Sequence, residues 1–146
     1  MKKILLLFAV IFLMTGCDVH KTYETYEVVS GVDLKVVYLE VRDNAWETVN
    51  NPDEGCFLFQ TFDNVPEITQ KVLNNGAVLA YLIESDGDVE RENILPYVFP
   101  LDNGVMKNIR FDYSVGEFTV ISEWSDSHLY TGGNCLIKVC ILYNVK

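Results

Sequence analysis

Apolar and polar residues alternate along much of this chain, most regularly from Val105 to Ser114. One set of alternate positions is mostly apolar and the other mostly polar: Val105, Lys107, Ile109, Phe111 and Tyr113 against Met106, Asn108, Arg110, Asp112 and Ser114. This two-residue period is typical of an antiparallel strand with one buried face. Residues 117–124 repeat the pattern, so we expect a hairpin whose three-residue loop, Ser114-Val115-Gly116, has Gly116 in the left-handed conformation. The chain is therefore expected to consist mainly of antiparallel strands.

Apolar residues predict four further strands, at residues 32–42, 56–62, 77–83 and 135–143. The first of these segments changes its apolar phase at Val36-Val37, which predicts a β-bulge. The third is apolar on both faces, which predicts a central strand that is covered on both sides. The polar stretches between the strands are predicted to be loops, at residues 43–54, 84–93 and 125–134.

A single short helix is predicted near residues 66–75. Pro66 suits the first turn of a helix, and Gly76 suits a left-handed stop. The apolar stripe that would pack on a sheet consists of Ile68, Val72 and Leu73. Many short strands with one helix are typical of an all-β fold, and the length of the chain suits one hydrophobic core. We therefore predict a single domain over residues 31–146, an antiparallel β-sandwich that is immunoglobulin-like or related.

The first residues have the composition of an export signal. A basic start is followed by an apolar run from Ile4 to Met14 and by Thr15-Gly16-Cys17. The run is shorter than the roughly 20 apolar residues of a membrane-spanning helix, and its basic start and small-residue end are typical of a cleavable secretory peptide.

Thr15-Gly16-Cys17 also resembles the lipobox of bacterial lipoproteins, although the family prefers Leu at the position of Met14. The resemblance implies cleavage after residue 16, acyl chains such as palmitate on Cys17, and a tether over residues 17–30. The membrane would then be a partner through this N-terminal lipid. The protein would lie in the cell envelope, facing the periplasm or the cell surface.

The charge balance excludes some partners. Removal of residues 1–16 takes away Lys2 and Lys3 but no acid, which leaves 9 basic and 21 acidic side chains and a net charge of −12. The remaining basic residues are scattered singly among acids, whereas nucleic-acid binding needs clustered Lys and Arg. We expect no nucleic acid partner and no electrostatic attraction to an anionic membrane surface.

A second resemblance extends over residues 46–143. It depends on five segments in a fixed order: Trp46, Phe57-Leu58-Phe59, Val65-Pro66-Glu67-Ile68-Thr69, Gly76-Ala77-Val78-Leu79-Ala80-Tyr81 and Leu95-Pro96-Tyr97. This pattern resembles small exported β-domains of Bacteroidetes-type bacteria, which look like β-sandwich lipoproteins of unknown activity. The resemblance implies the fold but assigns no functional residue. The chain departs from the pattern at Cys135 and Cys140.

A lipidated Cys17 leaves three cysteines, Cys56, Cys135 and Cys140, and therefore at most one intramolecular disulfide. Cys135 and Cys140 are five residues apart on one predicted strand, so their side chains should point to opposite faces and not bridge. Cys56 could pair with either, which would close a loop that contributes roughly 4 kcal/mol on the chain-entropy model. The simpler interpretation of Cys135 is a buried, unreactive thiol on the apolar face.

The sequence predicts no catalytic residue, metal or cofactor. A zinc site at His128, Cys135 and Cys140 lacks the short spacings that preorganise such sites. Asp86-Gly87-Asp88 lacks the other ligands of an EF-hand calcium loop. No motif of a serine hydrolase, metalloprotease, phosphate loop or dinucleotide-binding turn occurs.

Large aromatic residues in or beside the predicted loops are the candidate contacts, namely Trp46, Tyr97, Trp124 and Tyr130. Such rings can anchor a protein or stack on a glycan, or they can cover the end of the core. We therefore expect a non-catalytic binding or assembly module with a protein or glycan partner. Two alternatives are a small envelope hydrolase whose acids converge only in the folded chain, and a structural protein that assembles through a sheet edge.

Overall fold

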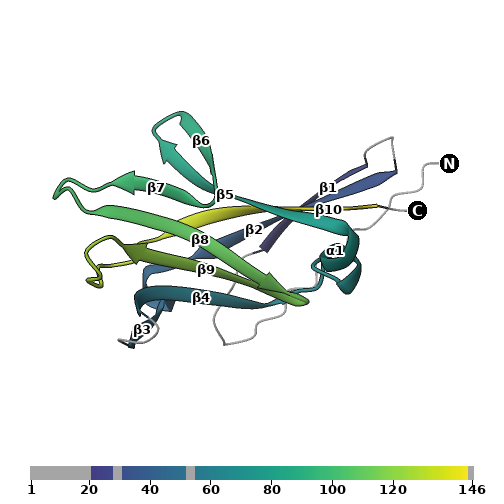
Figure 1. Ribbon diagram of the computed structural model, residues 1–146. Coiled ribbons are helices and arrows are strands. Elements are labelled where there is room, and N and C mark those ends of the chain that lie inside the picture. Colours follow the sequence, from purple (N-terminus) through teal and green to yellow (C-terminus); the bar gives the residue numbers. More distant parts are fainter. Residues whose placement is uncertain (1–20, 28–30, 52–54, 145–146) are drawn as a thin grey trace, which may run out of the picture.

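The computed structural model describes residues 21–27, 31–51 and 55–144. They form two antiparallel sheets packed as a sandwich, with one short helix (Figure 1), so the predicted all-β sandwich is confirmed. The first sheet has the order β1 (Lys21–Glu27), β2 (Val32–Val41), β10 (Cys135–Asn144), β5 (Gly76–Asp86) and β6 (Val89–Ile94). The second has the order β3 (Glu47–Asn51), β4 (Gly55–Val65), β9 (Gly116–Trp124), β8 (Met106–Ser114) and β7 (Tyr97–Pro100). The helix α1 covers Gln70–Asn75, and a 3-10 turn, η1, covers Asp43–Ala45.

The hydrophobic core lies between the two sheets. Alternate residues of the strands point inwards, as their two-residue period predicts. Residues with no exposed surface come from both layers, and they include Val37, Leu39, Val41, Ile137, Val139, Ile141, Phe118 and Val120. Among the described residues, no helix is long and apolar enough to cross a bilayer.

The hairpin of β8 and β9 confirms the predicted conformation of Gly116, whose φ is 79°. The register pairs Ser114 with Glu117, so the loop has two residues and is one residue shorter than predicted. The Gly116 amide donates a hydrogen bond of 2.8 Å to the carbonyl oxygen of Ile68. This bond fixes the hairpin to the turn that precedes α1.

The helix begins later than predicted. Thr69 caps α1, because its side-chain oxygen accepts a hydrogen bond from the amide of Val72 at 3.3 Å, whereas Pro66 lies in the turn before the helix. Gly76 is extended, with φ −121°, so the predicted left-handed stop is wrong. Glycine is needed there for close approach, because an added Cβ would overlap the carbonyl oxygen of Leu142.

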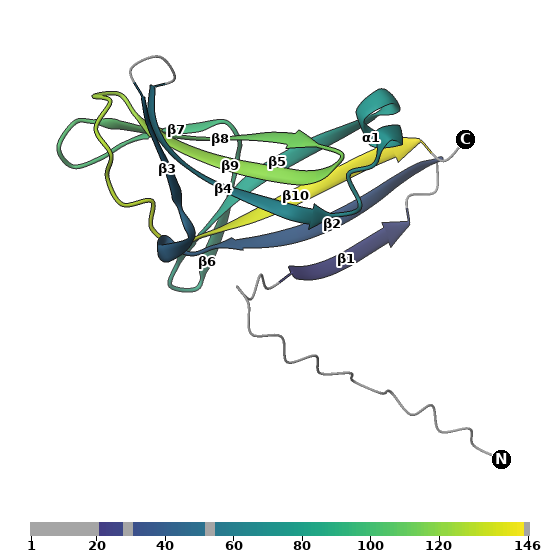
Figure 2. The same cartoon turned by 90° about the horizontal axis from the view of Figure 1, so that it is seen from below.

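Three strands lie in segments that were predicted to be tether or loop. β1 lies within the predicted tether, β3 within residues 43–54 and most of β6 within residues 84–93, whereas residues 125–134 form a loop as predicted. β7, a strand of four residues, was also not predicted. These four strands are the edge strands of the two sheets (Figure 2). Edge strands have a neighbour on one side only and carry many polar residues, so their sequence pattern is weak.

The predicted bulge in residues 32–42 is wrong. β2 pairs with β10 without a break from Val32 to Val41, and the register shift lies in β4, between Phe62 and Val65. The phase change at Val36-Val37 has another cause. Val37 points into the core while Val36 lies on the outer face of the first sheet, and both are almost fully buried.

β5 is central in its sheet, as predicted, but it is covered on one face only. Val78, Ala80 and Leu82 are buried on the inner face, whereas the Leu79 side chain on the outer face is 39% exposed. No second layer lies over the outer face of the first sheet in the described part of the chain. This face carries apolar residues, namely Leu34, Val36, Tyr81, Ile83, Leu136, Cys140 and Leu142, together with Tyr38, Glu40 and the salt-bridged pair Lys138 and Glu92.

We expect Ile68→Ala to lower the free energy of unfolding by about 2–5 kcal/mol, because Ile68 has no exposed surface and its loss leaves a cavity. The matched variant Leu73→Ala should cost below about 1 kcal/mol, since the Leu73 side chain is 40% exposed and does not complete the predicted stripe. Urea unfolding of the two variants measures the difference. Equal losses would contradict this packing.

Candidate functional site

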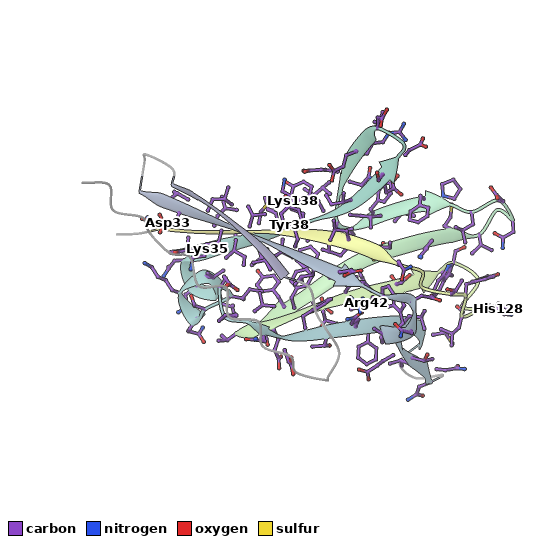
Figure 3. The ribbon with its side chains drawn as sticks, turned by 180° about the vertical axis from the view of Figure 1, so that it is seen from behind. Asp33, Lys35, Tyr38, Arg42, His128 and Lys138 are labelled. Atoms are coloured by element: carbon purple, nitrogen blue, oxygen red, sulfur yellow. The ribbon has the colours of Figure 1, made fainter. Side chains whose placement is uncertain are left out.

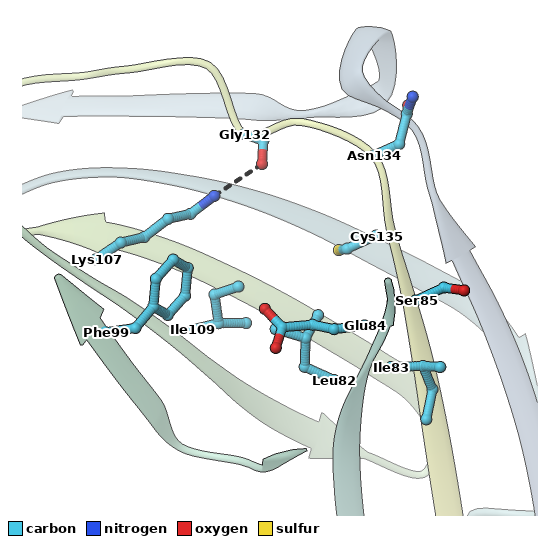
Figure 4. A pocket seen from close by; sticks show the side chains of 10 residues that line it. All are labelled: Leu82, Ile83, Glu84, Ser85, Phe99, Lys107, Ile109, Gly132, Asn134 and Cys135. Carbon is cyan, nitrogen blue, oxygen red and sulfur yellow. Dashed lines mark hydrogen bonds between the residues drawn. The ribbon is translucent and has the colours of Figure 1, made fainter. Parts of the chain in front are cut away.

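A cavity of about 370 Å³ opens between the two sheets (Figure 4). The strand ends that line it are at the end of the sandwich opposite α1 (Figure 1). β5, β7, β8 and the segment that leads into β10 contribute its lining residues, which are Leu82, Ile83, Glu84, Ser85, Phe99, Lys107, Ile109, Gly132, Asn134 and Cys135. Its volume is at the lower end of the range for small-molecule sites.

Strand alternation explains how two charged residues come to line this cavity. Ile109 on β8 and Leu82 on β5 are buried, inward-facing residues. Lys107 and Glu84 are each two positions further along their strands towards this end, so they keep the inward direction beyond the last buried residue. The cavity therefore has an apolar floor, with an amine from one sheet and a carboxylate from the other.

Lys107 is the cation of the cavity. Its Nζ donates a hydrogen bond of 2.9 Å to the carbonyl oxygen of Gly132 and lies 5.5 Å from the ring centre of Trp124, its cross-strand neighbour. Partial burial lowers the pKa of the Lys107 amine, while nearby Cys135 and Asp43 act in the opposite direction. Among the described residues, no carboxylate forms a salt bridge with Lys107.

Glu84 and Cys135 line the cavity beside Lys107. The Glu84 carboxylate points into the cavity (Figure 4) and accepts a hydrogen bond of 2.7 Å from the side-chain amide of Asn93. The thiol of Cys135 also points inwards (Figure 4). Burial raises the pKa of Cys135 to about 11, although the positive charge of Lys107 opposes the shift. The thiol is therefore protonated at neutral pH, and its nucleophilicity is low.

A hydrogen-bonded loop forms the roof of the cavity. The Asp43 carboxylate accepts hydrogen bonds from the Thr131 hydroxyl at 2.5 Å and from the Gly133 amide at 2.9 Å. These two hydrogen bonds lower the pKa of Asp43. Asn134 accepts a hydrogen bond of 2.8 Å from the Asp43 amide. η1 therefore holds the loop in place above Lys107.

Trp46 is part of the same roof. Its indole Nε1 donates a hydrogen bond of 2.8 Å to the carbonyl oxygen of Gly133. Gly132 passes so close to the indole ring that an added Cβ would overlap it. Glycine at position 132 therefore lets the backbone approach both Trp46 and the Lys107 amine.

The structure brings the other three candidate aromatics to this end of the sandwich as well. Trp124 is only 5% exposed, and its ring lies 5.6 Å from that of Tyr130. Tyr130 is 37% exposed, and its hydroxyl donates a hydrogen bond of 2.6 Å to Asp126. Tyr97 stacks on the cavity residue Phe99, with ring centres 5.3 Å apart. These aromatics support the cavity more than they form an exposed patch.

The described cysteines, Cys56, Cys135 and Cys140, are free thiols. Cys56 therefore forms no disulfide with Cys135 or Cys140 in this structure. Cys140 is paired between Val36 and Leu79 in the first sheet, out of phase with the core residues of β10, so the sandwich core separates it from the second sheet. Cys17 lies outside the described residues.

His128 does not join a cysteine. Its side chain is 79% exposed and lies beside Asp126, with Nδ1 3.6 Å from the carboxylate. Figure 3 shows His128 at the loop end of the sandwich, far from Lys138 in the middle of β10. In the described ranges, no group of three His, Cys, Asp or Glu side chains is placed to hold a metal ion.

Lys107 and Glu84 were not among the residues singled out from the sequence. One signal was available for Lys107, because it occupies an apolar-phase position of the strand that shows the clearest alternation. Its pairing with Glu84 depends on the packing of two sheets and has no local pattern. Comparison with protein-family models, with curated proteins and with solved structures finds no match, so the interpretation of this site depends on its geometry.

We expect Cys135 to react slowly with iodoacetamide. At pH 8, a thiol with a pKa of about 11 has a thiolate fraction about 100-fold lower than one with a pKa of 9.0. In the variant Cys56→Ser/Cys140→Ser, the alkylation rate should keep rising up to about pH 11. The same variant in denaturant is the control and should react at the ordinary rate. A folded-state plateau near pH 9 would contradict the burial of this thiol.

We also expect carbon NMR to place the pKa of Asp43 below 3.8. A pKa that is lower in the folded than in the unfolded state stabilises the protein above pH 4 or so, and this contribution is lost as the pH falls through the folded-state pKa. Thr131→Ala should raise the pKa of Asp43 towards 3.8, because it removes the largest cause of the shift. Thr61→Ala, on another hydrogen-bonded Thr pair, should leave it unchanged.

Proposed function

We propose that this chain is a lipid-anchored binding module of the cell envelope, which holds part of a protein or glycan partner in the cavity at the end of the sandwich and does not transform it. One observation carries the proposal: Lys107 is partly buried in a cavity without a carboxylate partner among the described residues. Removing an ammonium from water costs free energy unless its charge is compensated. Asp43 and the Gly132 carbonyl oxygen compensate this charge in part, and an acceptor group on a bound partner would add to that compensation.

The composition of the cavity also supports binding. Leu82, Phe99 and Ile109 give it an apolar floor, while charged groups stand at its sides. Ligand sites in proteins commonly combine an apolar lining with a few well-placed polar groups. The hydrogen bonds of Asp43 and Trp46 hold the roof loop, so less ordering is needed when a ligand binds.

The position of Cys17 supports the anchoring part of the proposal. Three residues separate Cys17 from the start of β1 at Lys21. Even when fully extended, this link spans only about 13 Å. Because β1 is the edge strand of the first sheet, acyl chains on Cys17 would hold that edge close to a membrane.

A hydrolase is supported less well by the same cavity. Paired-carboxylate chemistry requires two acids that face each other across a cleft, and Glu84 is the one carboxylate among the cavity's lining residues. A cysteine nucleophile requires a lowered pKa, whereas burial raises the pKa of Cys135. Both observations favour binding over catalysis.

Assembly is a second candidate function, because exposed apolar side chains lie on the outer face of the first sheet. Leu79 is 39% and Ile94 55% exposed there, and β1 and β6 are edge strands. Sedimentation of the purified protein over a range of concentrations tests it. Self-association that Leu79→Asp abolishes would support assembly, and a monomer at all concentrations would count against it.

The anchor is tested by acyl labelling and cell fractionation. The wild-type protein should incorporate a palmitate analogue and fractionate with membranes. Cys17→Ser should lose the label and leave the membrane fraction, whereas Cys56→Ser should behave as wild type because Cys56 belongs to the folded domain. Membrane retention of unlabelled Cys17→Ser would contradict lipid anchoring.

The binding function is tested by titration with amino acids, dipeptides, monosaccharides and disaccharides. Both tryptophans of the chain, Trp46 and Trp124, lie beside the cavity, so a ligand should change the intrinsic fluorescence and raise the thermal midpoint. Lys107→Met should shift both responses to ligand concentrations that are about tenfold or more higher. Lys71→Met is the matched control, because Lys71 also lies over an aromatic ring, that of Tyr143, but is on α1, at the other end of the sandwich. No response to any class would contradict the proposal.

A further inference from the structure

Lys107 and Glu84 present opposite charges to one cavity without neutralising each other. Lys107 comes from the second sheet and Glu84 from the first. Both line the cavity, yet no salt bridge joins them among the described residues. Figure 4 shows the side chains of Phe99 and Ile109 beside the Lys107 stem and the Glu84 carboxylate pointing towards them.

Each charged group keeps hydrogen-bonding capacity for a ligand. An ammonium has three donors, and the hydrogen bond to the Gly132 carbonyl uses one donor of Lys107. A carboxylate has two acceptor oxygens, and Asn93 donates to Oε2 of Glu84. The remaining donors of Lys107 fit a carboxylate, while the other oxygen of Glu84 fits an ammonium or another N–H donor.

We propose that the cavity binds a small zwitterion of amino-acid or dipeptide size, with its carboxylate at Lys107 and its ammonium at Glu84. Phe99, Ile109 and Leu82 would contact the apolar part of the ligand. The inference rests on the proposed binding function and narrows it to one ligand class. A cavity of 370 Å³ limits the size of the ligand.

The two charges also determine which ligands are disfavoured. A simple anion gains Lys107 but brings no new donor to Glu84, which keeps only the hydrogen bond from Asn93, and a simple cation does the reverse. A neutral sugar would add no negative charge to compensate the partly buried Lys107 ammonium, which Asp43 and the Gly132 carbonyl oxygen compensate only in part. A zwitterion satisfies both groups at once, which gives specificity by charge complementarity.

Titration calorimetry on the mature, lipidated chain in detergent tests the proposal with three ligands. Alanyl-leucine has both charges, N-acetyl-alanyl-leucine lacks the ammonium, and alanyl-leucinamide lacks the carboxylate. Each blocked ligand should bind about tenfold or more weakly than the free dipeptide, as expected for the loss of a charged hydrogen bond. This comparison needs no variant, so it does not depend on how substitutions affect folding.

Two variants assign each charge to its residue. Lys107→Met should weaken the free dipeptide about tenfold or more and the amide less than about twofold. Glu84→Gln should weaken the free dipeptide about tenfold or more and the acetylated dipeptide, which lacks the ammonium, less than about twofold. Lys71→Met and Glu90→Gln are the matched controls, on α1 and on the exposed β5–β6 hairpin, and should bind as wild type. Lys107→Gln replaces the Met variant if the latter fails to fold.

The outcomes separate this inference from the proposed function. Equal binding of free and blocked dipeptides would overturn the zwitterion class. So would a neutral sugar that binds in a Lys107-dependent way while dipeptides do not, although the binding function would then stand. If no amino acid, dipeptide or sugar changes the fluorescence of the two tryptophans, both proposals fail.

Discussion

Burial of inward-facing residues between two antiparallel sheets is the constraint on which the rest of this structure depends. Strands in the middle of each sheet contribute residues with no exposed surface, and this burial is the main favourable contribution to the stability of such a domain. The alternation of inward and outward side chains continues along β5 and β8 past the end of the core. Lys107 and Glu84 therefore point inwards at a place where the core is no longer filled, and the cavity arises from the same alternation that forms the core.

The loop of residues 125–134 converts this unfilled end into a defined site. Its glycines lie against Trp46, its carbonyl at Gly132 binds the Lys107 amine, and its Thr131 binds Asp43. A partly buried ammonium without a carboxylate partner lowers stability compared with an apolar residue. Such a group is retained more readily where a ligand uses it, which connects the energetics of the fold with the proposed binding function.

The sequence predicted the elements whose pattern is strong. Apolar and polar residues alternate clearly along β8, β9 and β10, because one face of each strand is buried. β1, β3 and β6 are edge strands, and their polar composition gives no clear strand pattern. The start of α1 at Gln70 follows from the side-chain cap of Thr69, which accepts a hydrogen bond from the Val72 amide, whereas the position of Pro66 had suggested an earlier start. The role of Gly76 was misassigned because the approach of the Leu142 carbonyl comes from a strand 66 residues further along the chain.

The sequence by itself determined the all-β class and the position of the main hairpin, because local periodicity encodes these features. It also predicts an export-type N-terminus from the composition of the first residues. Only the tertiary structure decided that Lys107 and Glu84 share one cavity and that Cys135 lines it. These residues come from strands of different sheets. A local sequence pattern predicts which side chains face inwards, but it does not predict which of them meet across the core. The candidate aromatics were found from sequence, but their supporting role followed from the close packing of the roof loop.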